Sequence, residues 1–389
     1  MIPRLARATL LEMAQGFPFL ALTGPRQSGK TTLARATFPG KPYVSLEDPD
    51  AREFADEDPR GFLAQFPDGA VLDEAQRCPA LFSYLQTLSD LDGRPGLFVL
   101  TGSQQFGLFS GLSQTLAGRV GMVQLLPFST AELTAVGRPP SELDGTLFTG
   151  MYPPLYDRPL DPGRWFASYV ATYVERDVRQ MVNVRDLSAF QRFVRLCAGR
   201  TGQLLNLSGL ASDAGITHNT AKAWVSILEA SYLVHLLPPH YENFNKRLVK
   251  TPKLYFLDTG LAAWLLGIQE AGQLATHPLR GPLFETWVVA ELLKSRFNQG
   301  LPSNLFFWRD RSGREVDVLM DEGTHLVPVE IKAGRTVNTD FFTGLKAWAA
   351  LAGPRAGRSR LIYGGDSSQV RSDVDLFSWR NLPGLPSKA

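Results

Sequence analysis

Short apolar runs punctuate the first third of the chain. The run at 19–22 predicts a strand, and the segment 32–35 after it predicts the start of a helix. Further runs predict strands at 42–46, 69–74, 97–101 and 120–126. Continuous apolar strands are typical of a parallel sheet that is buried on both faces. This part of the chain is therefore predicted to be an α/β domain.

In the middle of the chain the pattern changes to helical spacing. A connection rich in proline and glycine at 137–164 is followed by helically spaced apolar residues from 165 to 182. Residues 203–257 then predict a winged helix-turn-helix. Its expected parts are helix 209–214 capped by Ser208, a turn at Gly215, helix 218–230 capped by Thr217, and strands 233–237 and 254–257.

The pattern changes again from Pro282 onward. Residues 284–293 predict an amphipathic helix, and apolar runs after it predict strands. The expected strands are 305–309, 315–320, 326–332 and 360–363, with a further helix at 341–351. This alternation predicts a second α/β domain at the end of the chain.

A phosphate-binding motif lies between the first predicted strand and helix. The segment 24–31 fits G-x-x-x-x-G-K-[ST] at every fixed position. Its glycines let backbone N–H groups turn toward phosphates, Lys30 can reach the β- and γ-phosphates, and the Thr31 hydroxyl can hold Mg²⁺. The predicted nucleotide-binding residues are Gly24, Pro25, Arg26, Gln27, Ser28, Gly29, Lys30, Thr31 and Thr32.

Two acids end the predicted strand at 69–74. We expect Asp73 to hold Mg²⁺ together with Thr31, and Glu74 to polarise the attacking water as a general base. An acid next to the metal-binding Asp favours hydrolysis over simple nucleotide holding. A further strand between the P-loop and these acids is typical of the AAA-like branch of ATPases.

Two other positions complete the predicted catalytic set of Lys30, Glu74, Ser103 and Arg119. The strand at 97–101 is followed by Ser103 and Gln104, either of which could touch the γ-phosphate. Arg119 ends a helix-like segment. It is either an arginine finger for a neighbouring subunit's nucleotide or a cation that complements the helix dipole.

Several segments together resemble one family. They are Leu100–Phe106, Leu116–Arg119, Leu126–Ser129, Tyr152-Pro153, Tyr173–Val178 and a late Glu-x-Lys. On these segments the chain resembles prokaryotic AAA-type P-loop ATPases with a C-terminal restriction-endonuclease-like domain. Met151 departs from the glycine that the family often has before its Tyr-Pro. The resemblance covers nearly the whole chain and implies ATP binding and a nuclease-like C-terminal fold.

The predicted winged helix carries chemistry suited to DNA. The connecting loop holds Lys246, Arg247, Lys250 and Lys253 beside aromatic and amide side chains, a composition that suits phosphate contact. The residues that open the second helix, His218, Asn219, Thr220 and Lys222, would face bases. The alternative is a protein-packing module with a solvated loop.

The last domain carries the pattern D…E-x-K, which looks like the PD-(D/E)xK nuclease core. Residues two apart in a strand share a face, so Glu330 and Lys332 point the same way. We expect Asp317 and Glu330 to hold Mg²⁺ with Glu285 as a further ligand, and Lys332 to stabilise charge. Both an active nuclease and a silent fold that only binds DNA or proteins are compatible with this pattern.

Composition limits these hypotheses. The 389 residues predict two or three domains, and a net charge of +2 restricts any nucleic-acid surface to a local patch. The two cysteines have no paired spacing, which suits a reducing cytoplasm, and the histidines form no zinc-ligand cluster. No apolar stretch is long enough to predict a membrane span or a signal peptide.

The whole pattern predicts four regions. They are an AAA-like ATPase domain at 1–136, a linker and helical lid at 137–202, a winged-helix domain at 203–270 and a PD-(D/E)xK nuclease-like domain at 271–389. The expected function is Mg²⁺-dependent ATP hydrolysis by a cytoplasmic homo-oligomer that acts on DNA and cleaves it if the last domain is active. The alternative is an ATP-dependent switch that binds protein partners and carries a silent nuclease fold.

Overall fold

The structure, a computed structural model, describes residues 2–103, 116–178, 186–240, 250–310 and 312–382. Its contacts divide the chain into two compact units. Unit 1 comprises Met1–Phe128, Ala230–Tyr232 and Lys294–Pro302. Unit 2 comprises Ser129–Glu229, Leu233–Leu293 and Ser303–Ala389. Within the described residues, we find no helix with both the length and the apolar character needed to span a membrane.

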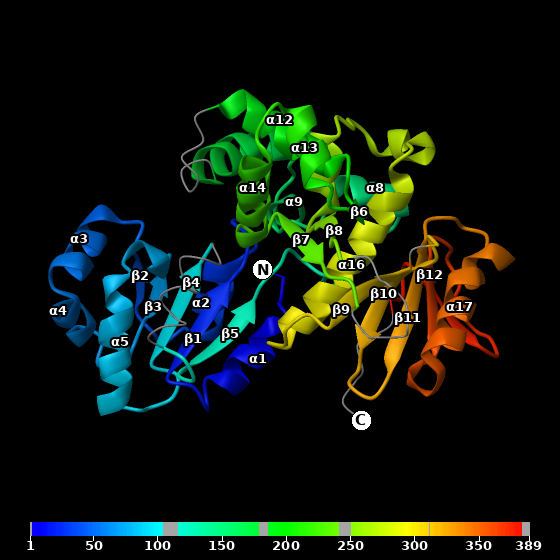
Figure 1. Ribbon diagram of the computed structural model, residues 1–389. Helices are drawn as coiled ribbons and strands as arrows, with labels where there is room; N and C mark the ends of the chain where they lie inside the picture. Colours follow the sequence, from blue (N-terminus) through cyan, green and yellow to red (C-terminus); the bar gives the residue numbers. More distant parts are fainter. Residues whose placement is uncertain (1, 104–115, 179–185, 241–249, 311, 383–389) are drawn as a thin grey trace. The chain divides into compact units, whose positions relative to one another are not determined.

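A five-stranded parallel sheet forms the centre of unit 1 (Figure 1). Its order is β2-β3-β4-β1-β5, so β4 separates the strand that precedes the P-loop from the acidic strand. The strands are β1 (Phe19–Thr23), β2 (Tyr43–Ser45), β3 (Val71–Asp73), β4 (Phe98–Gly102) and β5 (Val120–Gln124). The parallel α/β arrangement expected from the apolar runs is confirmed.

Alternation along β1 explains the layers of unit 1. Leu20 and Leu22 pack on one face with residues of two helices, and Phe19 and Ala21 pack on the other face with residues of three. The first face carries α1 (Ala6–Met13) and α2 (Lys30–Thr37). The second carries α3 (Pro49–Glu57), α4 (Pro59–Ala64) and α5 (Ala80–Leu91), with the short turn η1 (Ala75–Arg77) beside them. The central strands β1, β3 and β4 are buried along their whole length, which is the reason why they are almost entirely apolar.

Unit 2 begins with helices. They are α7 (Thr130–Ala135), α8 (Leu143–Thr149), α9 (Pro154–Asp157), α10 (Pro162–Tyr169), the π-helix η2 (Val170–Val178), α12 (Leu187–Ala198), α13 (Leu207–Ala214), α14 (His218–Ala230), α15 (Thr259–Leu265) and η3 (Ala271–Thr276). The long helix α16 (Arg280–Asn298) begins in unit 2, and its last residues belong to unit 1. A small antiparallel sheet of order β6-β8-β7 accompanies the helices, with β6 (Gln203–Leu204), β7 (Val234–Leu237) and β8 (Lys253–Phe256).

The end of unit 2 is a mixed six-stranded sheet of order β13-β14-β12-β11-β10-β9. Its elements are β9 (Leu305–Arg309), β10 (Glu315–Asp321), β11 (Leu326–Lys332), η4 (Thr339–Phe342), α17 (Thr343–Ala352), η5 (Gly353–Arg355), β12 (Ser359–Tyr363), β13 (Gln369–Val370) and β14 (Val374–Ser378). β9, β10 and β11 pair antiparallel, whereas β11, β12 and β14 pair parallel. Leu345 and Trp348 of α17 pack into the core on this sheet.

Within residues 203–257, the predicted turn at Gly215 and the predicted cap Thr217 are confirmed, and the predicted cap Ser208 is wrong. Gly215 ends α13 in the left-handed conformation, and the Thr217 hydroxyl accepts a hydrogen bond from the backbone N–H of Thr220. The expected cap Ser208 lies inside α13, because Asn206 caps this helix by accepting from the N–H of Gly209. Asn and Ser are about equally good caps, so composition alone did not select between them.

Candidate functional site

The P-loop joins β1 to α2 and depends on two glycines. Gly24 has φ +149°, and a Cβ there would collide with the backbone oxygen of Leu125. Gly29, at φ +93°, is the residue that precedes α2. The first N–H groups of α2 have no partner within the helix, and the helix dipole at this end favours an anion.

The Lys30 side chain is bound by the backbone of the P-loop itself. Its Nζ donates hydrogen bonds to the carbonyl oxygens of Gly24 at 2.9 Å and Pro25 at 2.8 Å. Burial lowers the pKa of Lys30 to about 8. The neighbouring Ser28 hydroxyl is buried and has no hydrogen-bond partner among the described residues. A lysine bound only to neutral carbonyls and an orphaned hydroxyl both suit a phosphate ligand.

Asp73 lies at the end of β3 within a ring of hydroxyls. Thr31 donates to it at 3.0 Å, Tyr43 donates at 2.8 Å and Thr101 also donates. Proximity to Asp73 and burial raise the pKa of Tyr43 to about 12, burial being the larger cause. The predicted pairing of Thr31 with Asp73 is thus present, and these two residues could hold a divalent cation. Tyr43 and Thr101 were not foreseen as their partners.

Glu74 follows Asp73 in a left-handed backbone conformation with φ 53°. Its carboxylate accepts a hydrogen bond from the Ser103 hydroxyl at 3.0 Å and another from the Gln76 side-chain amide. Ser103, expected to touch the γ-phosphate, therefore contacts Glu74 in this structure. The contact of Gln76 with Glu74 was not predicted, although Gln76 follows Glu74 by only two residues in the sequence. Gln104 lies outside the described residues.

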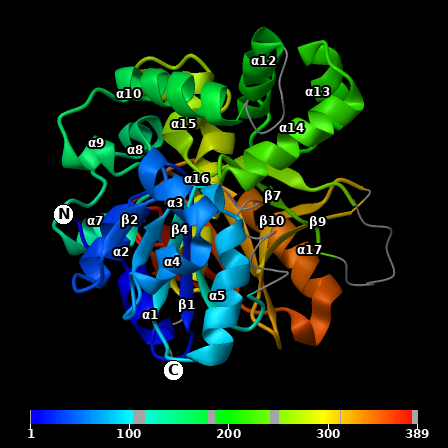
Figure 2. The same ribbon diagram turned by 90° about the vertical axis from the view of Figure 1, so that its left-hand side faces the viewer.

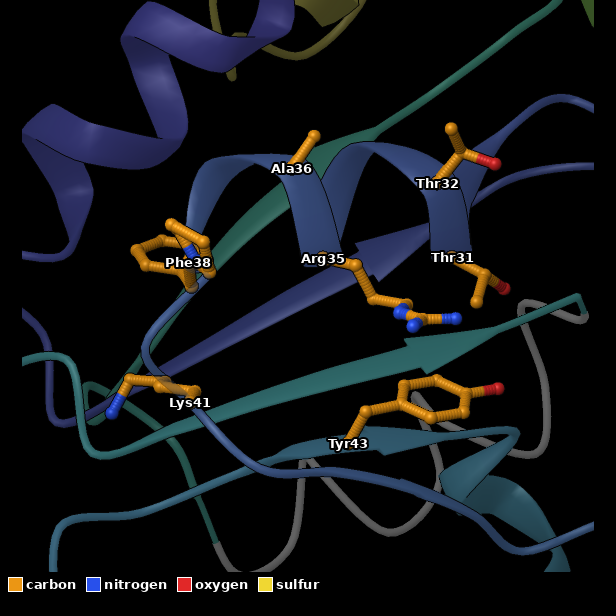
Figure 3. Close-up of a pocket in the computed structure, with 8 residues that line it drawn as sticks. Thr31, Thr32, Arg35, Ala36, Phe38, Lys41 and Tyr43 are labelled. Carbon is orange, nitrogen blue, oxygen red and sulfur yellow. The ribbon is translucent and has the colours of Figure 1, made fainter.

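A groove continues from Thr31 along α2 toward β2. It encloses about 600 Å³ and is lined by cationic and aromatic side chains. Figure 3 shows Thr31, Arg35 and Tyr43 directed into the same space. The Arg35 guanidinium lies 4.8 Å from the centre of the Tyr43 ring. At the other end, Lys41 donates to the carbonyl oxygens of Asp68 and Leu97, both at 2.8 Å.

Two arginines of unit 1, Arg4 and Arg119, differ in the groups that they bind. Arg4, before α1, donates to the carbonyl oxygens of Ser28 and Leu126, both at 2.6 Å, and so ties the N-terminal segment to the P-loop. Arg119, the predicted finger, forms an ion pair with Asp90 at 2.6 Å. Arg119 is partly exposed, so this pair is worth little to stability.

A second cluster of acids and lysines lies on the six-stranded sheet of unit 2. Val318 pairs with Val329, which places Asp317 and Glu330 at the next positions of the two strands. The Lys332 ammonium lies 2.6 Å from Glu330 and 3.5 Å from Asp317. Burial, together with the charge of Asp317, raises the pKa of Glu330 to about 8. The predicted D…E-x-K residues are thus brought together.

Glu285, the predicted third metal ligand, is bound by other residues. The Lys253 ammonium of β8 contacts Glu285 at 3.0 Å and Glu315 at 2.5 Å. The Tyr255 hydroxyl donates to Glu285 at 2.5 Å, and burial raises the pKa of this carboxyl. Across the described residues, no group of three or more His, Cys, Asp or Glu side chains is arranged to hold a metal ion. Lys253, expected to contact DNA, is instead buried here.

Three of the four predicted DNA-reading positions are exposed, and the fourth, Thr220, is half-buried. His218 and Asn219 open α14 toward solvent, Lys222 follows one turn later, and Lys250 is also exposed. Lys246 and Arg247 lie outside the described residues. Figures 1 and 2 both show α12, α13 and α14 next to one another within unit 2.

Comparison with known proteins finds family matches for three stretches of the chain. Residues 16–134 match the family described as an AAA domain. Residues 141–272 and 280–382 match two domains of unknown function, DUF8612 and DUF4143. Uncharacterized protein Mb2031c of Mycobacterium bovis and Uncharacterized protein Rv2008c of Mycobacterium tuberculosis are each 30% identical over 374 residues, covering 95% of this chain and 81% of the relative. The chain belongs to the family of these two proteins. Its N-terminal part is an AAA-type P-loop ATPase domain.

Solved structures overlap with the chain only loosely. The Walker-type ATPase PABY2304 of Pyrococcus abyssi has a TM-score of 0.44 and 17% identity, covering 67% of this chain and 94% of that chain. The Thermotoga maritima RuvB Holliday junction branch migration motor has a TM-score of 0.28 and 18% identity, covering 60% and 89%. Overlaps at this level carry no inference about this chain.

Proposed function

We propose that this protein is a Mg²⁺-dependent ATPase that acts on DNA. The observation that carries the proposal is the convergence of Lys30, Thr31, Asp73 and Glu74 at the carboxyl ends of β1 and β3. In a parallel sheet this edge is where ligands bind. The match of this region to an AAA domain supports the same reading.

Each of these four residues would have its own role in ATP hydrolysis. Lys30 would leave the carbonyls of its own loop and contact the β- and γ-phosphates of ATP. Thr31 and Asp73 would hold Mg²⁺, which supplies charge neutralisation of the phosphates. Glu74 would take a proton from the attacking water. Ser103 and Gln76, which bind the Glu74 carboxylate, would orient it toward that water.

Action on DNA is supported by the order of elements in unit 2. The sequence α12, β6, α13, α14, β7, β8 is helix, strand, helix, turn, helix and two strands, which is typical of a winged helix. The start of α14 is the part of such a fold that enters a groove of DNA, and here His218 and Asn219 are exposed.

The proposal is tested by ATP hydrolysis with purified full-length protein, with and without duplex, branched and single-stranded DNA. We expect DNA to stimulate turnover. We expect K30A and E74Q each to reduce turnover by at least about 100-fold, because each removes a group that acts on the transition state. E74Q should still bind ATP. Active K30A protein would contradict the site assignment. ATP hydrolysis indifferent to every DNA would favour the alternative, a switch that binds proteins.

A second candidate function is DNA cleavage by unit 2. It is favoured by the convergence of Asp317, Glu330 and Lys332 on adjacent strands and by Glu330 Oε2, which is buried without a hydrogen-bond partner among the described residues. Asp317 and Glu330 would hold Mg²⁺ in exchange for Lys332, and the ion would lower the pKa of a bound water. Nicking of DNA that needs Mg²⁺ and is lost in D317A would establish this activity. Intact DNA at every Mg²⁺ concentration would assign a silent fold.

Arg119 and assembly remain predictions. As a finger, Arg119 would have to leave Asp90 and reach the nucleotide of a neighbouring copy. The rate of ATP hydrolysis per subunit would then rise with protein concentration in the native protein.

A further inference from the structure

Helix α12 has one apolar and one basic side. Phe190, Phe193 and Cys197 of α12 are buried in unit 2. Arg192 and Arg195 lie on the exposed side, between Ser188 and Gly199. Steps of three and four residues keep side chains on one face of a helix, so these positions form a continuous strip.

This strip borders a groove of about 400 Å³. Arg192, Arg195 and Arg200 all line it, and none of its described lining residues is an acid. Arg200 forms an ion pair with Asp213 of α13, whose side chain is half-exposed. We refer to these three residues and the space between them as the arginine groove.

Two of the three guanidinium groups lack an acidic partner in the part of the chain that the structure describes. Arg192 and Arg195 form no ion pair and no hydrogen bond with any described side chain. The nearby acid Asp186 accepts a hydrogen bond from the N–H of Ala189 and so caps α12. Two unneutralised guanidinium groups one turn apart repel each other, and this repulsion is relieved when anions bind.

The chemistry of the groove selects the ligand. A guanidinium presents a planar fork of N–H donors that matches the oxygens of a phosphate, and it stays charged at every physiological pH. Successive phosphates along one strand offer repeated anions to a row of arginines. α12 packs against α13, and the Arg200–Asp213 pair links the two helices just before the exposed start of α14. The groove thus belongs to the helix group that would read DNA.

We propose that the arginine groove holds the phosphate backbone of duplex DNA. This inference rests on the proposed function and adds a contact that carries no sequence information. Phosphate contacts fix register and orientation on the duplex, whereas base contacts at the start of α14 would select sequence. Loss of the groove therefore weakens binding to all duplexes by a similar factor.

The test measures binding of a fluorescent duplex to the full-length protein at several salt concentrations. Each phosphate contact contributes about −0.9 to the slope of the logarithm of the binding constant against the logarithm of salt concentration. R192Q/R195Q removes two contacts, so we expect the slope to become shallower by about 1.8 and binding to weaken most at low salt. ATP hydrolysis without DNA should stay as in the native protein.

The matched control is R158Q/R164Q, which makes the same change in net charge at two exposed arginines elsewhere in unit 2. This control should keep the native slope. A native slope in R192Q/R195Q, or an equal loss in the control, would overturn the groove while leaving DNA binding intact. Native protein that binds no duplex would instead overturn the proposed function. Recovery of the native slope in R192K/R195K would support a contact made through charge.

Discussion

Two buried clusters of lysine and carboxylate in this molecule are held together differently. At the P-loop, the Asp73 carboxylate is bound by the hydroxyls of Thr31, Tyr43 and Thr101, and Lys30 is bound by backbone carbonyls. In unit 2, the ammonium of Lys253 contacts two carboxylates directly.

The difference shows how the same residue types serve different roles. A carboxylate held by neutral hydroxyls keeps its negative charge available, so a divalent cation can bind at little cost. A carboxylate held by a buried ammonium already has its counter-charge within the fold, and removing either partner leaves an unpaired buried charge. The P-loop cluster is therefore prepared for a ligand, whereas the Lys253 cluster stabilises unit 2.

K253M is expected to lower the free energy of unfolding more than any other substitution considered for the two clusters. The substitution leaves Glu285 and Glu315 without their shared cation, while the Lys253 side chain is only 3% exposed. Loss of one partner of a buried pair costs about 3–5 kcal/mol of unfolding free energy. Urea unfolding followed by tryptophan fluorescence measures it. K222M, at an exposed lysine of the same unit, is the control and should unfold like the native protein. A native unfolding midpoint in K253M would contradict the structural role of this lysine.

A medium effect is expected in the pH dependence of stability. The folded-state pKa of Glu330 is raised from 4.5 to about 8 by burial and by Asp317. The folded state thus holds a proton that the unfolded chain has released, so this group makes stability fall as pH rises from 4.5 toward 8. The slope for one proton is about 1.4 kcal/mol per pH unit.

E330Q removes this titration. Its unfolding free energy should therefore depend less on pH than that of the native protein between about pH 5 and 8, the interval that separates the two protonation equilibria. Urea unfolding at four pH values in this interval measures both slopes, and E322Q, at a partly exposed acid of the same unit, is the control. Parallel curves for E330Q and the native protein would show that Glu330 is ionised in both states.

The smallest effect concerns the hydroxyl ring around Asp73. Y43F removes one hydrogen bond to the Asp73 carboxylate. The aromatic ring that the Arg35 guanidinium covers stays in place. A hydrogen bond to a charged group is worth about 1.5 kcal/mol or more, so we expect the Mg²⁺ concentration for half-maximal hydrolysis to change by about tenfold. Y84F, at a tyrosine with the same 37% exposure on α5, is the control. An unchanged Mg²⁺ dependence in Y43F would show that Tyr43 does not position Asp73.

Much of the nucleotide site could be predicted because its parts are local. Gly24 and Lys30 belong to one strand–loop–helix motif, and Asp73 and Glu74 are adjacent at the end of one apolar run. Parallel strands bring their carboxyl ends to the same edge, so motif and strand pattern together locate the site. The partners of these acids were missed, because Tyr43 and Thr101 reach Asp73 only through the order and register of neighbouring strands.

The sequence alone predicted the five strands of the sheet in unit 1, the P-loop between β1 and α2, and the shared strand face of Glu330 and Lys332. These follow from spacing along the chain, since local periodicity fixes which side chains share a face. The contact of Lys253 with Glu285 and the groove beside the basic side of α12 become apparent only in the folded structure. Those contacts join residues far apart in sequence, and their electrostatics depend on which charges folding brings together and shields from water.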